Sequence, residues 1–444
     1  MKDEKKFRKA QYNFIFSSMI VYAFFYLTRK NLSMAQPFML EEGVVSDITI
    51  GVILSIHGIV YGLSRFVNGF WADRLNGRIF MTVGLSIAVV VGLLAGFIPG
   101  MSGAISCTMM GYTWNLNAIC ISSALFGVLW TVNAWAQGMG FPPCAKMLTH
   151  WIHPKELATK MSIWNTSHSF GAVMALGLCS LLIGPLGLGW RWCFWVPALL
   201  AAIASIFCFF RVKDSPTEAG VEELEIEGKE VKHEAEGTVT TKDRMRLVFT
   251  NKVIWMVAIA NFFVYIIRFG FLDWGPTFLK QFKGIPVSKG GLMIIAFELA
   301  AVVGTIFAGW ATDKWFKGRG VRTCVLCMLF ASLFAFGFWF LPQGAPIWQA
   351  TLLLMGAGFC IYGPQALIGI IVANQATNEA AAMANGFAGI MGYLSTLVSG
   401  VGIAYMKVTY GWGAALFTIA AMALVGMVIM LFAWNAKANG YKNA

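Results

Sequence analysis

Few charged side chains interrupt the long apolar stretches of this sequence, and two arginines among them occupy matching positions. Arg29 follows Tyr26 by three residues, and Arg268 follows Tyr265 by the same spacing, 239 residues further along the chain. Placing a cation at the centre of a membrane costs at least ~2.5–3.5 kcal/mol, so such a residue needs a polar cavity or a partner. A guanidinium stays charged at physiological pH and matches two oxygens of a phosphoryl group. The pair therefore predicts binding of a phosphate-bearing anion.

A lone arginine inside an apolar stretch has two simpler explanations. It can be neutralised by a nearby carboxylate, or its long side chain can extend to the lipid headgroups. Because the Tyr-x-x-Arg pattern recurs at a matching depth in both parts of the chain, we favour ligand binding over either explanation.

Further polar side chains within the apolar stretches predict a wall around these arginines. Membrane tyrosines usually gather at the two interfaces, whereas several tyrosines of this chain lie inside the stretches, away from their ends. For each one, packing with a satisfied hydroxyl is the alternative. The predicted lining residues are Tyr26, Tyr61, Tyr265, Gln137, Asn165, Tyr362, Tyr393 and Asn385.

Arg65 and His168 are two more candidates for contact with a phosphoryl group. Histidine titrates near neutral pH, and a phosphate monoester has its second pKa near ~6, so protonation of His168 can follow the charge state of the ligand. The alternatives are that His168 only bonds a neighbour and that Arg65 extends toward the headgroups.

Other charged residues are predicted to act as gates. Lys30 follows Arg29 directly and points about 100° away from it on a helix, so the two do not share one contact. The pattern Gly-x-x-x-Asp followed by a basic residue begins at Gly69 and again at Gly309, 240 residues later. Ion pairs in these loops can lock helix ends in one state, and a purely topological role is the alternative. The loop candidates are Asp73, Arg74, Asp313 and Lys314.

Composition indicates which elements must position these residues. Charged residues make up 12% of the 444 residues and apolar residues 58%, whereas soluble domains carry about 25% charged residues. Positions 79–144 and 323–378 contain no charge, and about 20 apolar residues span a bilayer. The basic N-terminus precedes a retained helix, since no small-residue cleavage site follows. We expect an all-α membrane protein with twelve spans, near residues 12–38, 48–73, 79–100, 117–145, 157–185, 190–211, 252–280, 289–313, 322–342, 347–374, 378–406 and 412–435.

The shared offset of the two motif pairs predicts two similar six-helix bundles related by a pseudo-twofold axis. The predicted parts are an N-terminal bundle over residues 1–211, a cytoplasmic linker over 212–250 and a C-terminal bundle over 251–444. Eight glutamates make the linker a solvated segment rather than a ligand site. Basic loops alternate along the chain, which places both termini in the cytoplasm and explains the net charge of +12 without nucleic-acid binding.

The chain carries no pattern typical of catalysis or of a cofactor. Its nine cysteines are scattered mostly in apolar stretches and are expected to be buried small side chains. Histidines and cysteines do not show metal-ligand spacing, so we expect neither a metal nor another cofactor. No Walker A motif is present, so a gradient rather than ATP must drive any transport, and we expect no enzymatic activity.

Several longer motifs resemble one family. The loop from Gly69 resembles the signature of the major facilitator superfamily, and a closer match is to its organophosphate:phosphate antiporters, the bacterial glycerol-3-phosphate and hexose-6-phosphate antiporters. The similarity runs from the first span to the eleventh. Its motifs are Tyr26–Asn31, Gln137–Cys144, Trp164–His168, Val264–Gly270 with Leu272–Trp274, and Tyr362–Pro364.

The resemblance implies phosphate contact for Arg29 and Arg268, and it implies that Lys30 pairs with Asp273 or Glu298 when phosphate is absent. A static salt bridge is the alternative for that pair. Arg65 stands where many family members have lysine. Two fixed cations make an empty site costly to reorient, so exchange of an organic phosphate for inorganic phosphate follows, by rocking of the halves. We expect a monomer in the bacterial inner membrane, contacting only lipids and its two phosphate ligands.

The organic part of the ligand is less well specified. The Asp and Lys of hexose-phosphate antiporters in the eleventh span align with Asn385 and Ala388, and the run Leu272–Thr277 is similar to glycerol-3-phosphate members. We favour glycerol-3-phosphate over hexose-6-phosphate and phosphoglycerate. A hexose-phosphate sensor with the same arginines remains the alternative function.

Overall fold

The computed structural model describes residues 2–99, 104–109, 112–152, 154–221, 241–376 and 380–437. Internal contacts divide the chain into two units, one of Met1–Ser46 with Val60–Glu234 and one of Asp47–Ile59 with Ala235–Ala444. The second helix therefore contributes its first half to the second unit. Of the predicted linker, residues 222–240 lie outside the described residues.

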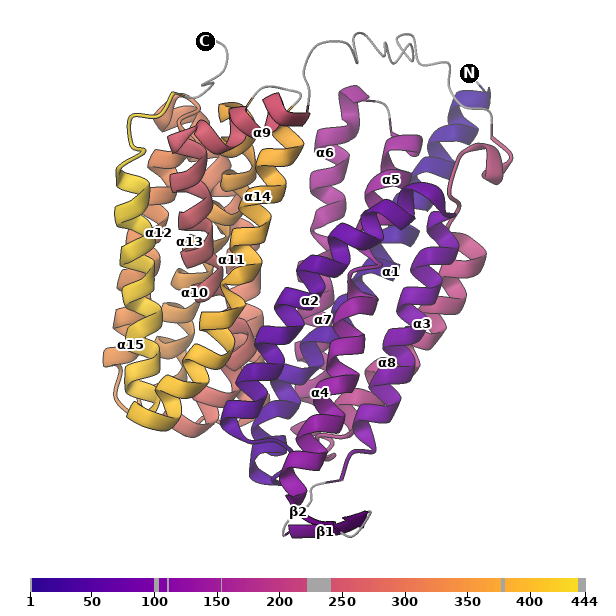
Figure 1. Ribbon diagram of the computed structural model, residues 1–444. Helices are drawn as coiled ribbons and strands as arrows, with labels where there is room; N and C mark the ends of the chain where they lie inside the picture. The colour runs from indigo at the N-terminus through magenta and orange to yellow at the C-terminus, as the bar shows by residue number, and fades with distance from the viewer. Residues whose placement is uncertain are drawn as a thin grey trace. The chain divides into compact units, whose positions relative to one another are not determined.

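The first unit is built from helices that Figure 1 colours indigo to magenta. Its membrane helices are mostly joined by short turns, and Asn76 caps one of them by accepting a hydrogen bond from the backbone N–H of Ile79 at 3.3 Å. The elements are α1 Lys2–Glu41, α2 Asp47–Arg74, α3 Gly77–Gly96, α4 Ala118–Gln137, α5 Phe141–Trp151, α6 Pro154–Asn165, α7 Ser167–Ile183, α8 Trp192–Arg211 and the 3₁₀ turn η1 Thr217–Ala219.

The second unit, drawn in red to yellow, follows the same plan. Asn251 caps its first membrane helix, and Gly284 ends that helix in the left-handed conformation, with φ of 68°. The elements are α9 Thr241–Thr250, α10 Lys252–Lys283, α11 Val287–Phe316, α12 Gly320–Phe340, α13 Ile347–Gln375, α14 Ala381–Leu394, the π-helical turn η2 Val398–Gly402 and α15 Ile403–Leu431.

Packing inside each unit repeats. In the first unit α1 packs against α7 and α8, while α3 packs against α4 and α8. In the second unit α10 packs against α14 and α15, while α12 packs against α13 and α15. These are corresponding pairs if α10 matches α1 and α12 matches α3. The internal repeat predicted from two motif pairs therefore also holds for helix packing.

Nine helical stretches among the described residues are long and apolar enough to cross a membrane. One of them, Met383–Leu431, covers the predicted spans eleven and twelve, so the nine account for ten of the twelve predicted spans. The remaining two are span one, which is the helix α1 with Arg29 in its interior, and span four, which is divided between α4 and α5 with Gln137 at the end of α4.

Several predicted spans differ in detail from the helices. The fourth is interrupted at residues 138–140 and continues to Trp151, the fifth is interrupted at Thr166, and α15 runs through a kink at Gly411, whose φ is 82°. Pro142 and Pro143 near the start of α5 explain the first interruption, because proline is accepted in a first helical turn but not within a helix.

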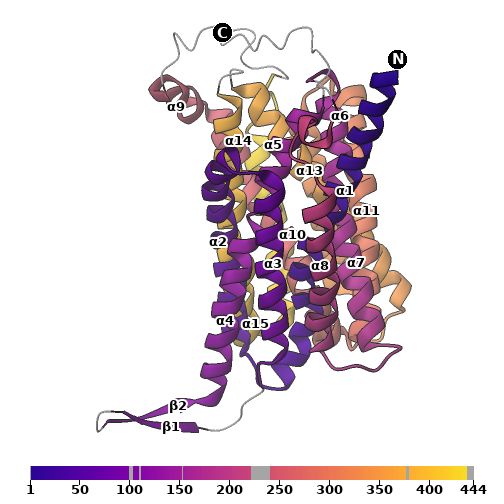
Figure 2. The same ribbon diagram turned by 90° about the vertical axis from the view of Figure 1, so that its right-hand side faces the viewer.

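The predicted all-α membrane fold is confirmed, and one two-stranded antiparallel hairpin is added to the helices. Strand β1, Ala104–Met109, pairs with β2, Tyr112–Asn117, in the register Ala104 to Asn117. It lies between α3 and α4, where we predicted an uncharged loop. Figure 2 shows it at the end of the unit opposite the N-terminus.

The described start of the linker is docked onto the first unit. Glu218 forms an ion pair with Arg78 at 2.7 Å, and Asp214 accepts a hydrogen bond from the Gly77 N–H at 2.7 Å. Trp151 donates from its indole N–H to the Lys213 carbonyl oxygen at 3.0 Å. Glu218, one glutamate of the predicted solvated linker, is thus bonded to Arg78 in the first turn of α3. The other end of the linker forms the helix α9.

Candidate functional site

Arg268 lies on α10 and is 7% exposed. Its guanidinium carbon is 5.7 Å from the ring centre of Tyr265, one turn earlier, and 4.8 Å from that of Tyr362 on α13. Cations within about 6 Å of an aromatic face are attracted to it. Two tyrosines from two helices therefore hold this charge inside the second unit.

A carboxylate completes this group. The Tyr362 hydroxyl donates to Glu298 Oε1 on α11 at 2.7 Å, and Glu298 is 1% exposed. The interaction links α13 to α11 beside Arg268. The ring of Tyr362 thus contacts Arg268, while its hydroxyl bonds a buried carboxylate.

Arg29 lies on α1 in a related setting in the first unit. Its guanidinium carbon is 5.7 Å from the ring centre of Tyr26 and 4.2 Å from that of Tyr61 on α2. The distance to the tyrosine one turn earlier equals that of Arg268 to Tyr265. The Tyr-x-x-Arg repeat of the sequence is thus a repeat of local geometry.

Arg65 joins Arg29 at the same aromatic ring. Its guanidinium carbon is 5.9 Å from the centre of Tyr61 and 4.2 Å from that of Phe141, the first residue of α5. Tyr61 also interacts electrostatically with both arginines and forms a hydrogen-bonding contact with Tyr22. The structure therefore brings together Arg29, Arg65 and Tyr61, three of the predicted residues.

Two amide side chains on α4 donate hydrogen bonds to Thr28, the residue that precedes Arg29. Gln137 Nε2 donates to Thr28 Oγ1 at 3.1 Å, and Asn133 Nδ2 donates to the Thr28 carbonyl oxygen at 3.4 Å. Gln137 is 3% exposed, so it holds α1 from within the packing of the bundle. We did not predict Thr28 and Asn133. The spacing of four residues between Asn133 and Gln137, which places both on one helix face, was the available signal.

His168 lies where span five is interrupted. Its Nδ1 bonds the Asn165 carbonyl oxygen, the Ser169 hydroxyl is 3.3 Å from its Nε2, and its ring centre is 5.6 Å from that of Tyr26. The break between α6 and α7 makes this possible, because the Asn165 carbonyl oxygen then does not have to accept a hydrogen bond from a backbone N–H of a continuous helix. His168 is thereby held beside the tyrosine that contacts Arg29.

Glycines allow close approach beside both repeat tyrosines. A Cβ on Gly171 of α7 would be 2.7 Å from Tyr26 Cβ, and one on Gly392 of α14 would be 3.3 Å from the Tyr265 ring. Such distances are below ordinary contact for Gly171 and tight for Gly392. Tyr393 follows Gly392, and its ring centre is 6.1 Å from that of Tyr265.

The remaining predicted residues differ in their burial and in their helices. Lys30 is 6% exposed on α1, Asp273 is half-buried on α10, and Asn165 is exposed. Asn385 is exposed and donates to the Ala381 carbonyl oxygen at 3.1 Å within α14. Their roles stay predictions.

The predicted gate residues of the loops show different contacts. Arg74 lies over the Phe70 ring at 3.8 Å and Lys314 over the Trp310 ring at 5.1 Å. Asp313 is exposed, and the side chain of Asp73 lies outside the described ones. Within the described part of the chain, no group of three or more His, Cys, Asp or Glu residues has a metal-binding arrangement.

Comparison with known proteins extends the sequence resemblance. The family model described as Major Facilitator Superfamily matches residues 18–400. The glycerol-3-phosphate transporter of Bacillus subtilis is 31% identical over 423 residues, covering 94% of this chain and 90% of that protein. A probable hexose phosphate transport protein of Chlamydia pneumoniae is 32% identical, covering 98% and 93%.

Two further comparisons broaden this picture. The membrane sensor protein UhpC of Escherichia coli is 30% identical, covering 98% of this chain and 94% of that protein. A bacterial homologue of the human lysosomal transporter Spinster, inward-facing and unoccupied, matches the fold with a TM-score of 0.76 at 13% identity, covering 96% and 97%. The chain is a multi-pass membrane protein of a transporter family and not an enzyme. It belongs to the Major Facilitator Superfamily, where its motifs and relatives place it in the organophosphate:phosphate antiporter family.

Proposed function

We propose that this protein exchanges an organic phosphate ester for inorganic phosphate across the bacterial inner membrane, with both termini in the cytoplasm. The observation that carries the proposal is the repeated setting of Arg29 and Arg268, each held over the tyrosine one turn before it at 5.7 Å. A planar, permanently charged fork is suited to two phosphoryl oxygens. Relatives named for glycerol-3-phosphate and hexose phosphate transport support the ligand class.

Electrostatics supports exchange rather than one-way passage. Both arginines contact the phosphoryl group during the cycle, with Arg65 and His168 as additional donors. An empty site with two fixed cations is costly to carry across a low-dielectric membrane, so the site reorients when it holds an anion. Lys30 pairs with Asp273 or Glu298 in the empty state, and substrate binding loosens that pair.

Glycerol-3-phosphate is the preferred organic substrate. The run from Leu272 to Thr277 is similar to glycerol-3-phosphate members, and Asn385 and Ala388 replace the charged pair of hexose-phosphate members. Asn385 is exposed on α14, where an uncharged amide can bond a small polyol. The Bacillus subtilis relative carries the corresponding name.

A counterflow panel tests the proposal. Purified protein in vesicles loaded with inorganic phosphate receives radiolabelled phosphate outside, and unlabelled esters compete from either side. We expect glycerol-3-phosphate to exchange best, then hexose-6-phosphate and phosphoglycerate. Failure of every ester to exchange would refute the antiporter function.

A sensor is the second candidate, favoured by the 30% identity to a membrane sensor protein over 443 residues. A sensor would bind the same esters through the same arginines without sustained exchange. Ligand-induced thermal stabilisation without counterflow in the same vesicles would therefore identify a sensor. We expect a monomer in either case, and size determination in detergent checks this.

A further inference from the structure

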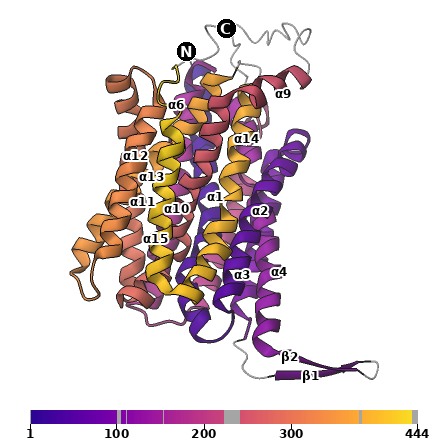
Figure 3. The same ribbon diagram turned by 60° about the vertical axis from the view of Figure 1, so that its left-hand side comes forward.

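The helix α9 lies at the end of the second unit, just before α10. It packs against α10 and α14. Figures 2 and 3 show it extending sideways past the edge of that unit instead of along the membrane helices. A helix that turns parallel to a membrane surface at the end of a membrane helix is in position to contact headgroups.

The corner between α9 and α10 is fixed by hydrogen bonds. Asn251 accepts from the backbone N–H groups of Val253 and Ile254 at 2.9 and 3.3 Å, and its own Nδ2 donates to the Gln375 carbonyl oxygen at 3.0 Å. The Trp255 indole donates to the Phe249 carbonyl oxygen at 2.8 Å. The orientation of α9 is therefore set by the bundle.

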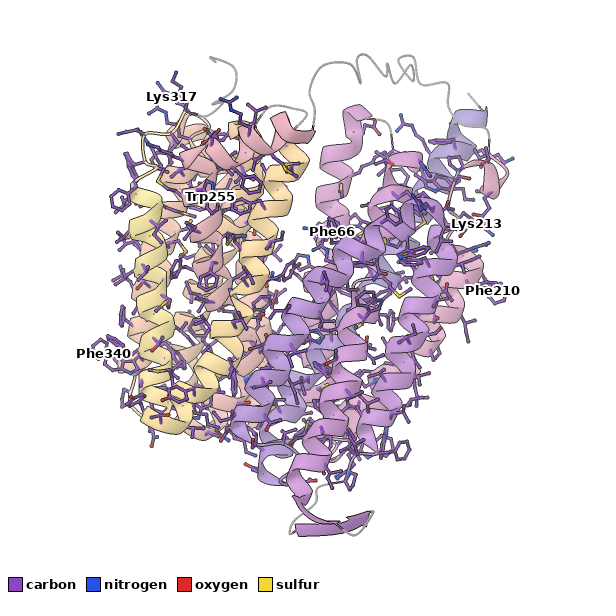
Figure 4. The ribbon with its side chains drawn as sticks, viewed as in Figure 1. Phe66, Phe210, Lys213, Trp255, Lys317 and Phe340 are labelled. Carbon is purple, nitrogen blue, oxygen red and sulfur yellow. The ribbon has the colours of Figure 1, made fainter. Side chains whose placement is uncertain are left out.

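Aromatic side chains fasten the same corner. The ring of Phe249 is 5.3 Å from that of Phe387 on α14, and Trp255 is 4.7 Å from Phe387. Figure 4 labels Trp255 just below α9. Aromatic residues of this kind are enriched at the level of the lipid headgroups.

An apolar surface of α9 is exposed although the helix is anchored. Met245 and Phe249, one turn apart, are 47% and 44% exposed. The surface continues onto α10 through Trp255 and Ile259, which are 36% and 37% exposed. Ile259 is nine residues before Arg268, half a turn out of phase, so this side of α10 faces away from the arginine.

Basic residues outnumber acidic ones in the segment that carries this apolar surface. It holds four basic residues and one acidic residue, and Arg246 and Lys252 are exposed. We propose that α9 binds the membrane leaflet at this end of the second unit, with Met245 and Phe249 inserted at the headgroup level and Arg246 and Lys252 on acidic phospholipids. Continuity with the outward side of α10 favours lipid over a soluble protein, and the charge favours acidic over neutral headgroups. The basic and acidic residues are Lys242, Arg244, Arg246, Lys252 and Asp243.

Depth measurement tests the insertion. Full-length Met245→Cys protein carries a fluorescent thiol label in vesicles that contain a lipid quencher at the headgroup level, and unsubstituted protein treated in parallel gives the background. Leu247→Cys is the matched control, because residue 247 is also exposed but about 160° away around the helix. We expect about threefold stronger quenching at 245 than at 247 in vesicles with acidic lipid. Equal quenching at both positions would overturn the proposal.

Charge substitution tests the lipid specificity. In the labelled Met245→Cys protein, Arg246→Gln with Lys252→Gln removes two cations, and each is worth about fivefold in affinity for an acidic surface. We expect quenching at 245 to rise with the acidic lipid fraction in the parent and to become insensitive to it in the double variant. Lys289→Gln, an exposed lysine at the start of α11, is the control and should behave as the parent. Insertion that ignores lipid charge in the parent would contradict the assignment. None of these readouts requires transport.

Discussion

Arg29 and Arg268 each contact a tyrosine one turn earlier on their own helix, but the tyrosine that each contacts on a neighbouring helix has different surroundings. Arg268 lies against Tyr362, whose hydroxyl is bonded to the carboxylate of Glu298 at 2.7 Å. Arg29 lies against Tyr61, and that ring is shared with a second guanidinium, that of Arg65. One half of the repeat thus joins its arginine to an acid, and the other joins it to another base.

The sequence extends this difference beyond single contacts. Asp73, at the end of α2, is the one acidic residue within the six spans predicted for the N-terminal half, whereas the C-terminal half holds Asp273 and Glu298 in span interiors. An anion should therefore gain most of its attraction from the N-terminal half. We expect the carboxylates of the C-terminal half to offset only part of the positive charge of the empty site, because a buried guanidinium is stabilised by a nearby carboxylate.

The largest expected effect comes from replacing either repeat arginine by lysine. Lysine keeps the charge but loses the planar fork, and a lost charge-assisted hydrogen bond is worth about 1.5–3 kcal/mol, or roughly 10- to 100-fold. We expect Arg29→Lys and Arg268→Lys each to lower phosphate counterflow by that factor. Arg191→Lys is the control, since Arg191 directly precedes α8 and pairs there with Glu42 at 3.1 Å. Full counterflow in either variant would show that the fork is dispensable.

The next largest effect distinguishes Tyr362 from Tyr61, the tyrosines that contact the two arginines from neighbouring helices. Tyr362→Phe removes the donor to Glu298, and leaving a buried acceptor unsatisfied costs about 1–3 kcal/mol, so we expect about tenfold slower exchange. Tyr61→Phe keeps the ring beneath both arginines and should slow exchange less. Initial rates in vesicles and thermal stability of both variants provide the measurement. A larger loss for Tyr61→Phe would reverse the comparison.

The arginines, the tyrosines one turn before them and the carboxylate Glu298 could be predicted from the sequence. A charged residue in an apolar stretch and a repeated Tyr-x-x-Arg pattern can both be recognised without knowing the fold. Sequence reasoning did not separate the roles of Tyr61 and Tyr362, which depend on which helices become neighbours. It also missed Thr28, a residue with no charge and no repeat partner, whose importance appears only when α4 packs beside α1.

The same limit applies to the fold. Apolar length predicted the spans, but the interruption at Thr166 and the hairpin of residues 104–117 depend on local hydrogen bonds that hydropathy does not contain. The acidic neighbours of Glu218 in the sequence predict a solvated segment. The partner of Glu218, Arg78, lies 140 residues earlier and is reached only through folding.

A smaller effect is expected at Thr28, and it tests whether phosphate binding by Arg29 depends on the hydrogen bond between Gln137 and Thr28. Thr28→Val keeps the shape but removes the acceptor for Gln137, and one hydrogen bond contributes about 1 kcal/mol, or roughly fivefold. We expect the KM for phosphate to rise by that factor with little change in maximal rate. Thr28→Ser, which restores the hydroxyl, should recover the KM. A loss of thermal stability with an unchanged KM would assign Thr28 to folding alone.

The smallest expected effect concerns pH, and it belongs to the N-terminal half because all five histidines precede residue 234. A carbonyl oxygen only accepts, so the bond to Asn165 places a proton on Nδ1 of His168. Neutral His168 then presents Nε2 as an acceptor, and only the imidazolium can donate to an anion there. We expect the KM for phosphate to rise about threefold more between pH 6 and 8 in the parent than in His168→Gln, whose amide donates at any pH. Because both proteins receive the same phosphate, its own ionisation cancels, and parallel profiles would remove His168 from the site.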